Sequence, residues 1–288
     1  MRELRLGRRL RARLSPSPVE RAAARLDLTI VRPFDGGVFG AVLVQRADSE
    51  QLVLKASDDI SLASEWATGA AMATRLRARG YPAPVYAGTG CDDEVAWSLQ
   101  HLLAGEVPAL LSEACALQLI ALAQAHAVDA GTTRAWDVLA RQAAMRWLLD
   151  IGSLPHAFDD RLAAVLRDTA DVTVLRTTIV HGDFHHRNCL VSGEQITGVF
   201  DWDIAGAGDW RFDLVCLAFG SAVGPKTCEP GAAEAFVEAA RAECDAATAA
   251  FLMACQTLRI LSMTRTRRPA ALERTSTRLE AALGGWFG

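Results

Sequence analysis

Two stretches of the sequence decide its fold, HGDFHHRN at residues 181–188 and VFDWD at residues 199–203. Asp183, four further residues and then Asn188 reproduce the spacing of a kinase catalytic loop. Asp201 follows an apolar, strand-like run. Phosphoryl transfer needs a carboxylate that accepts a proton from the attacking hydroxyl, and oxygen ligands for magnesium on the nucleotide phosphates. Asp183 suits the first role, and Asn188 with Asp201 suits the second.

Two other interpretations compete with this one. Asp and Asn are common in plain turns, because their side chains bond to nearby backbone groups. His185 and His186 beside Asp183 would also suit a transition metal. However, the sequence shows neither a His-x-x-x-His motif on a helix nor paired cysteines. The complete pattern between two apolar runs therefore favours a small-molecule kinase.

The composition sets broad limits on the protein. It has 288 residues, of which 51% are hydrophobic and 22% charged, so one large or two smaller folded domains are expected. No apolar run approaches the length of a bilayer span, and the Arg-rich residues 1–14 lack the apolar core of a secretory signal. Seven cysteines without C-x-x-C spacing indicate reduced thiols. We expect a cytoplasmic protein without a membrane partner.

The charges of the chain are unevenly distributed. Residues 1–100 hold 14 basic and 12 acidic residues, whereas residues 101–288 hold 16 and 22, a net charge of −6. The acidic second part favours a cationic small-molecule substrate and argues against a nucleic-acid partner. Of the 30 basic residues only Lys55 and Lys226 are lysines.

The first hundred residues are predicted to form a small β-rich lobe. SPVE at residues 17–20 is a capping box that opens a helix to about Leu26. Strands are expected over residues 28–33, 38–45 and 51–56. Between the first two strands, Gly36 and Gly37 would let the backbone close over a phosphate, and they would equally serve a hairpin turn.

Lys55 lies on the third of these strands, where a kinase carries the lysine that pairs with nucleotide phosphates. A lysine that extends from a strand edge into water is the alternative. In a chain so poor in lysine, with a glycine turn before Lys55 and a catalytic loop after it, the nucleotide role is favoured. The next predicted helix, over residues 62–79, offers Glu65 as the ion-pair partner of Lys55.

The lobe boundary is predicted between residues 100 and 101. A nucleotide base would meet backbone groups there, from Gln100 to Leu102. From residue 112 onward the pattern becomes helical. Helices are expected over residues 112–127, 132–151, 157–169, 230–243, 246–266 and 270–283. The predicted fold is therefore α+β, with a nucleotide-binding lobe (1–100) and a larger, mainly helical catalytic and substrate-binding lobe (101–288).

Together these motifs resemble the aminoglycoside phosphotransferase family, a branch of the protein-kinase-like fold. The resemblance covers roughly residues 30 to 220. It is carried by HGD at 181–183 with Asn188, VFDWD at 199–203, GDWRFDL at 208–214, Lys55, and the helix end LAQAHA at 122–127.

The resemblance implies a role for each matching residue. Asp183 would be the catalytic base, and Asn188 and Asp201 the magnesium ligands. Asp203 would assist the metal or only the loop. Lys55 would contact the ATP phosphates, and its ion-pair partner would be Glu65 or else Asp58 or Asp59. Asp213 would be a structural acid that holds the catalytic loop.

We thus expect a kinase that uses ATP and Mg²⁺ to phosphorylate a hydroxyl of a cationic antibiotic and confers resistance. A metabolic kinase of the same fold, acting on an amino alcohol or a sugar, is the first alternative. A kinase-like binding module without activity is the second, and the complete set of Lys55, Asp183, Asn188 and Asp201 argues against it.

Overall fold

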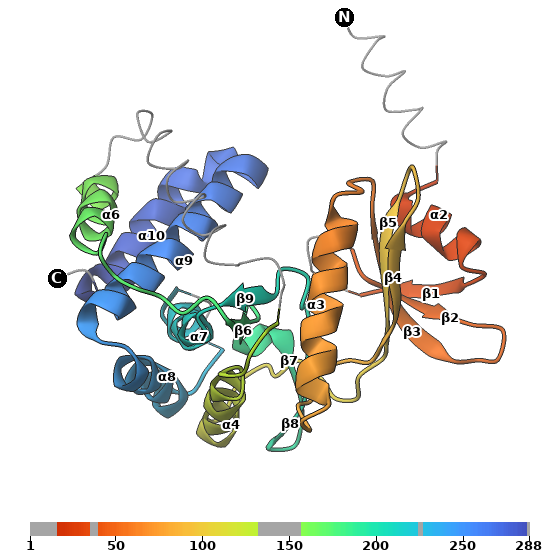
Figure 1. The fold of residues 1–288 in the computed structure, drawn as a ribbon, viewed down its shortest axis with the longest axis horizontal. Helices are drawn as coiled ribbons and strands as arrows, with labels where there is room; N and C mark the ends of the chain where they lie inside the picture. The colour runs from red at the N-terminus through yellow and green to blue at the C-terminus, as the bar shows by residue number, and fades with distance from the viewer. Residues whose placement is uncertain (1–15, 35–39, 132–156, 224–226, 287–288) are drawn as a thin grey trace, which may run out of the picture.

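The computed structural model describes residues 16–34, 40–131, 157–223 and 227–286. It has two lobes, a small amino-terminal one built on a β-sheet and a larger one made mainly of helices (Figure 1). The α+β, two-lobed, kinase-like architecture predicted from the sequence is confirmed. The boundary between residues 100 and 101 falls at the end of strand β5 (Ala96–His101), and it stays a prediction.

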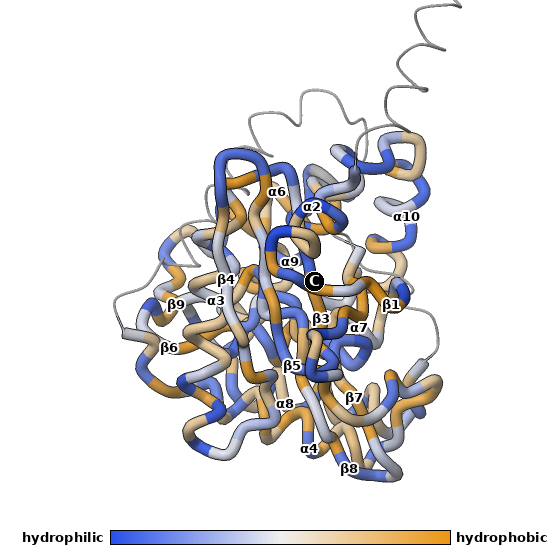
Figure 2. The backbone as a smooth tube through the Cα atoms, turned by 90° about the vertical axis from the view of Figure 1, so that its right-hand side faces the viewer, coloured by the Kyte–Doolittle hydropathy of each residue, from blue (hydrophilic) through white to orange (hydrophobic). Residues whose placement is uncertain are grey.

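The small lobe is a five-stranded antiparallel sheet flanked by two helices. Its other elements are α2 (Pro18–Arg25), β1 (Thr29–Pro33), β2 (Val42–Gln45), β3 (Gln51–Ser57), α3 (Leu62–Arg77) and β4 (Tyr86–Cys91). The strand order is β1-β2-β3-β5-β4, with α2 packed on β1 and β3, and α3 packed on β4 and β5. The predicted capping box opens α2: Ser17 and Glu20 exchange hydrogen bonds between side chain and backbone. The turn between β4 and β5 is hydrophilic (Figure 2).

The alternation of side chains along β3 sets the direction of Lys55. Leu52 and Leu54 are buried in the core that the sheet shares with α2. Successive side chains of a strand point to opposite faces. Lys55 therefore points away from this core, and its ammonium reaches Asp201 and Asp203 in the helical lobe.

The larger lobe combines helices with two antiparallel strand pairs, β6 with β9 and β7 with β8. Helix α7 lies at its centre and packs against α8, α9 and α10. The elements are α4 (Glu113–Gln124), α6 (Ala157–Asp168), β6 (Thr178–Val180), β7 (Cys189–Ser192), β8 (Gln195–Val199), β9 (Gly206–Gly208), α7 (Arg211–Val223), α8 (Pro230–Glu243), α9 (Ala246–Arg267) and α10 (Leu272–Leu283), with 3₁₀ turns at His186–Asn188, Pro269–Ala271 and Gly284–Trp286.

Helix α3 joins the two lobes. Its residues Met72 and Leu76 belong to the hydrophobic core of the helical lobe, although α3 covers the sheet. The helix also approaches the segment that carries Asp201 closely, since a Cβ added to Gly69 would lie 2.0 Å from the carbonyl oxygen of Trp202. Only glycine permits this contact, so Gly69 holds α3 against that segment.

Helix α9 is long and apolar enough, by length and composition, to cross a membrane, and it is the only such helix among the described residues. In the structure 61% of its apolar window is buried inside the protein, including every residue from Phe251 to Leu258. The apolar character of α9 is thus accounted for by its place in the core of the helical lobe.

The structure differs from the predicted elements at several points. Strand β2 begins at Val42 and not at residue 38, and helix α7 was not predicted at all. The predicted helix over residues 132–151 lies outside the described residues. The other predicted helices are present, and their ends either agree with the prediction or differ from it by one to three residues.

Candidate active site

The catalytic loop and the loop that carries Asp201 meet because β7 and β8 form a hairpin. Asn188 directly precedes β7, Phe200 directly follows β8, and the pairing of Cys189 with Val199 places these two ends side by side. The backbone N–H of Phe200 donates a hydrogen bond of 3.0 Å to the carbonyl oxygen of Asn188. The hairpin therefore brings Asp201 beside the loop of Asp183.

Asp213 is fully buried at the start of α7 and anchors the catalytic loop. Its Oδ2 accepts a hydrogen bond from the backbone N–H of His181 at 2.8 Å, and its Oδ1 accepts one from the backbone N–H of Gly182 at 3.0 Å. The ring of His126 places Nδ1 2.8 Å from Oδ2 and Nε2 2.9 Å from the hydroxyl of Tyr81. Asp213 thus has the contacts of a structural acid.

Replacing Asp213 with Ala should lower the free energy of unfolding by about 3 kcal/mol or more. The change leaves the three donors without their acceptor, and each buried unsatisfied group costs about 1–3 kcal/mol. Urea unfolding of the Asp213→Ala variant measures this loss, with the exposed Asp160→Ala as a matched control. A loss no larger than that of the control would show that Asp213 does not anchor the loop.

Asp183 has donors on both carboxylate oxygens. Arg259, from α9, donates from Nη2 to Oδ1 at 2.6 Å. Asn188 donates from Nδ2 to Oδ2 at 3.3 Å, and Nε2 of His185 lies 3.5 Å from the same oxygen. Burial alone would raise the pKa of Asp183, but the Arg259 guanidinium and His185 hold it well below its usual value. With 29% of its side chain exposed, the ionised carboxylate can meet a hydroxyl group.

Lys55 connects the sheet to the helical lobe through two carboxylates. Its Nζ donates to Oδ1 of Asp201 and, at 2.8 Å, to Oδ2 of Asp203. Burial would lower the pKa of Lys55, but these carboxylates raise it above its usual value. Burial and the neighbouring Asp201 raise the pKa of Asp203 to about 6, whereas Lys55 outweighs burial at Asp201 and lowers its pKa. Two acids that share one ammonium repel each other, and a second cation would relieve this repulsion.

The residues at this point fit a magnesium ion. Mg²⁺ binds through one or two carboxylates together with substrate phosphates, and Asp201 and Asp203 would supply the carboxylates. The side-chain nitrogen of Asn188 donates to the carbonyl oxygen of Asp183 at 2.9 Å, and no described residue donates to its Oδ1. Asp201 also has a left-handed φ of 67°, a costly conformation for residues other than glycine that is often found at functional sites.

The contacts do not favour a transition-metal site. Among the described residues, no three or more His, Cys, Asp or Glu side chains are grouped so that they could hold a metal ion. His186 contacts the hydroxyl of Thr227 through Nε2 at 2.5 Å. Burial is the main cause that lowers the pKa of His186 to about 4.

The predicted partners of Lys55 are only partly resolved by the structure. The contacts shown for its ammonium are those with Asp201 and Asp203. Asp58 pairs with Arg21, and Asp59 accepts hydrogen bonds from Ser61 in the turn before α3. Glu65 lies half-buried in the first turn of α3, and its pairing with Lys55 stays a prediction.

Four other nucleotide contacts were predicted, and the structure describes two of them, Gln100 and Leu102. Gly36 and Gly37 lie outside the described residues. Gln100 is in β5, opposite Val53 of β3, and Leu102 follows directly with 43% of its surface exposed. The role of both residues at a nucleotide base stays a prediction.

Arg259 was not predicted from the sequence, although it makes the shortest contact with Asp183. Its Nε also donates to Oε1 of Gln256 at 2.9 Å. The only signal in the sequence is local charge: residues 246–288 hold six arginines and two acids, within a lobe of net negative charge.

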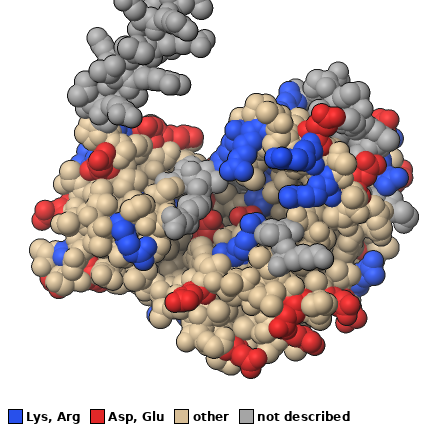
Figure 3. Space-filling model, turned by 180° about the vertical axis from the view of Figure 1, so that it is seen from behind, with Lys and Arg blue, Asp and Glu red and all other residues tan. Residues whose placement is uncertain are grey.

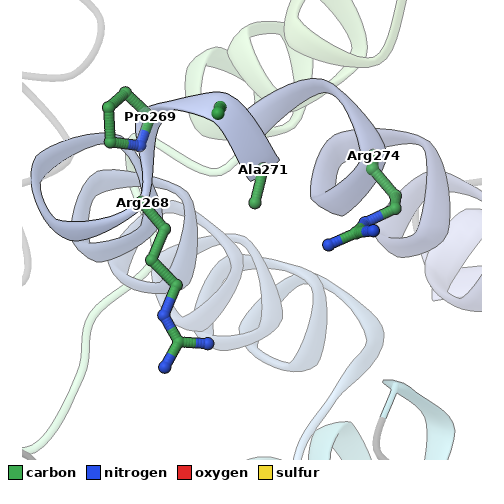
Figure 4. Close-up of a pocket in the computed structure, with 5 residues that line it drawn as sticks. Arg268, Pro269, Ala271 and Arg274 are labelled. Carbon is green, nitrogen blue, oxygen red and sulfur yellow. The ribbon is translucent and has the colours of Figure 1, made fainter.

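Acidic and basic side chains meet in a hollow between the lobes, and Lys and Arg side chains gather on the rim of the helical lobe (Figure 3). A separate cavity of about 350 Å³ lies at the turn from α9 to α10, lined by Arg268, Pro269, Ala270, Ala271 and Arg274. The side chains of Arg268 and Arg274 extend to the same side of this turn (Figure 4). None of the predicted site residues lines this cavity.

Solved structures of antibiotic phosphotransferases are similar to the chain. A thermostable mutant of aminoglycoside phosphotransferase APH(4)-Ia, in ternary complex with ADP and hygromycin B, has a TM-score of 0.70 and 14% identity, over 93% of this chain and 98% of that one. The apoenzyme of macrolide 2'-phosphotransferase MphH from Brachybacterium faecium has a TM-score of 0.61 and 21% identity, over 90% and 96%. The GDP and kanamycin complex of APH(2")-IIia has a TM-score of 0.65 and 15% identity, over 90% and 95%. At these identities the likeness shows the fold alone.

Comparison of the sequence with protein-family models identifies the family. No curated protein sequence matches the chain significantly. A model of the phosphotransferase enzyme family, however, matches residues 30–252. The match includes the sheet, both loops of the site and Asp213. The chain therefore belongs to the phosphotransferase enzyme family.

Proposed function

We propose that this chain is an ATP- and magnesium-dependent kinase that phosphorylates a hydroxyl group of a small molecule, with an antibiotic as the first acceptor to test. The observation that carries the proposal is the convergence of Asp183, Asn188, Asp201 and Lys55 from two loops and one strand. Structural neighbours crystallised with ADP or GDP support a nucleotide in the hollow between the lobes.

The residues divide the work of phosphoryl transfer among them. Asp183 orients the acceptor hydroxyl and takes its proton. When bound, Mg²⁺ neutralises charge on the phosphates, and Asn188, Asp201 and Asp203 would hold it. Lys55 contacts the same carboxylates and supplies a positive charge toward the phosphates. Positioning and electrostatic stabilisation account for most of the catalysis in such reactions.

Two acceptor classes are candidates. A cationic antibiotic, whose phosphorylation would confer resistance, is supported by the net charge of residues 101–288 and by the hygromycin B and kanamycin bound to structural neighbours. An acceptor with an acidic group, as in many hydroxylated metabolites, is favoured by Arg259 beside Asp183. We place the enzyme in the cytoplasm, where ATP is available and its seven free cysteines would stay reduced.

An ADP-release assay tests the proposal. The purified chain is given ATP and Mg²⁺ with aminoglycosides, macrolides, amino alcohols, sugars and hydroxy acids, and GTP replaces ATP in a parallel series. We expect acceptor-dependent ADP release that stops when EDTA removes the metal. Binding of ATP and Mg²⁺ without turnover on any acceptor would instead favour a binding module.

Replacing Lys55 with Met should lower kcat/KM for ATP about ten- to a hundredfold. The change removes a charge-assisted contact, which contributes about 1.5–3 kcal/mol, and leaves Asp201 and Asp203 without their shared cation. Steady-state kinetics against ATP measure the loss. Arg46→Met, which removes an exposed cation from the turn between β2 and β3, is the matched control. Wild-type kinetics in the Lys55→Met variant would mean that Lys55 does not serve the nucleotide.

A further inference from the structure

Arg259 projects from the core helix α9 to the catalytic carboxylate. Its side chain is 25% exposed. A guanidinium is planar and has five N–H donors. The edge formed by Nε and Nη2 is occupied, because Nε donates to Gln256 and Nη2 donates to Asp183. No described residue accepts a hydrogen bond from Nη1, so no partner among the described residues occupies the end formed by Nη1 and Nη2.

This open end has the geometry that binds an acid. The two terminal nitrogens of an arginine form parallel hydrogen bonds with the two oxygens of a carboxylate or phosphate. Because Nη2 lies 2.6 Å from Oδ1 of Asp183, a group held at this end would lie directly beside the hydroxyl that Asp183 activates.

The charges around Arg259 do not favour a cation at the same place. Asp183, the carboxylate that Arg259 contacts, already has this guanidinium as its basic partner. An ammonium group next to Arg259 would be repelled, and like charges in close contact are costly.

The surrounding segment carries the same sign. Residues 246–288, which include α9 and α10, hold six arginines and only Glu273 and Glu280 as acids, a net charge of +4. Residues 101–245 hold ten basic and twenty acidic residues, a net charge of −10. The negative charge of the helical lobe therefore lies elsewhere in the sequence, and the segment that reaches the base is basic.

We propose that Arg259 is the specificity-determining residue of the acceptor site, and that the acceptor carries an acidic group, a carboxylate or a phosphate, next to the hydroxyl that is phosphorylated. The inference rests on the proposed function and selects between its two acceptor classes. Arg259 would hold the acidic group by its open end while Asp183 receives the hydroxyl.

Thermal unfolding of the full chain tests the anion site directly. The protein, saturated with AMP-PNP and Mg²⁺, is titrated with malonate as a dicarboxylate probe, with putrescine as a dication probe, and with sodium chloride at matched ionic strength. We expect malonate to raise the Tm of the wild type by about 2–4 °C at a tenfold excess over its Kd. Putrescine should not raise it beyond the salt control.

Variants identify the residue responsible. Arg259→Gln should abolish the response to malonate, and Arg259→Lys, which keeps the charge but loses the planar fork, should weaken it about tenfold or more in Kd. Arg167→Gln, at an exposed arginine near the end of α6, should respond like the wild type. If Arg259→Gln does not fold, the comparison of Arg259→Lys with the wild type still shows whether Arg259 binds malonate.

The outcomes separate the two proposals. The inference of an acidic acceptor would be overturned by any of three results: an equal rise in Tm with malonate in all variants, no rise in the wild type, or a larger rise with putrescine. The response to AMP-PNP and Mg²⁺ alone reports on the proposed kinase function. If AMP-PNP and Mg²⁺ stabilise the wild type but malonate adds nothing, only the inference about Arg259 fails. If AMP-PNP and Mg²⁺ have no effect, the kinase function itself fails.

Discussion

Asp183→Asn is expected to lower turnover at least about a hundredfold, the scale usual for lost general-base catalysis. The amide has nearly the same shape as the carboxylate and can still accept a hydrogen bond from Arg259. It cannot take a proton from the acceptor hydroxyl. Because Asp183 makes its contacts with Arg259, Asn188 and His185, and none of them with the anchor Asp213, the loop should keep its conformation.

Single-turnover and steady-state kinetics with an accepted substrate measure this loss, and calorimetry with AMP-PNP and Mg²⁺ checks that nucleotide binding is retained. Asp168→Asn, at the exposed end of α6, removes one carboxylate away from the site and controls for the change in net charge. A loss below tenfold in Asp183→Asn would show that another group acts as the base.

The loop from His181 to Asn188 could be singled out from the sequence because its pattern depends on short spacings. Asp183 and Asn188 belong to one loop, and the strand-like runs after them already indicate the hairpin that returns the chain to Asp201. Lys55 could also be singled out, since its place on the third predicted strand and the scarcity of lysine pointed to it, and its role toward a nucleotide stays a prediction. Its contacts were not accessible, because Lys55 and Asp201 are 146 residues apart in the sequence.

Helix α7 was missed for a physical reason. Every residue from Phe212 to Phe219 is buried, so this helix has no polar face and shows little of the 3.6-residue periodicity by which surface helices are recognised. The apolar run from Leu214 to Phe219 is ambiguous between a strand and a buried helix. Tertiary packing against α8, α9 and α10 decides the outcome.

The net charge of a whole lobe did not predict the basic side chain that contacts Asp183, which is Arg259. The net charge of residues 101–288 predicted a cationic substrate, but that sum averages an acidic part with a basic one. Whether the acidic or the basic part reaches Asp183 depends on the packing of α9, because Arg259 lies 76 residues after Asp183 in the sequence. Only the three-dimensional structure places Arg259 of the basic segment beside Asp183.

Removing the charge of Asp201 should abolish the dependence of nucleotide binding on magnesium. Asp201→Asn is the cleaner variant, because asparagine tolerates the left-handed φ of 67° at this position, whereas alanine would add backbone strain. Lys55 keeps its contact with Asp203, so the sheet stays joined to the helical lobe. Turnover should also fall at least about a hundredfold, because a metal ion contributes several kcal/mol of charge stabilisation in the transition state.

Calorimetry with AMP-PNP, in Mg²⁺ and then in EDTA, measures the effect. In the wild type the affinity should fall when the metal is removed, and in Asp201→Asn it should be the same in both conditions. Asp168→Asn should keep the wild-type dependence, since it changes the net charge by the same amount. If the Asp201→Asn variant still binds AMP-PNP more tightly with Mg²⁺, the metal ligands would be Asp203 and Asn188 instead. Asp203 would then be a metal ligand, and its contact with Lys55 would not serve only to support the loop.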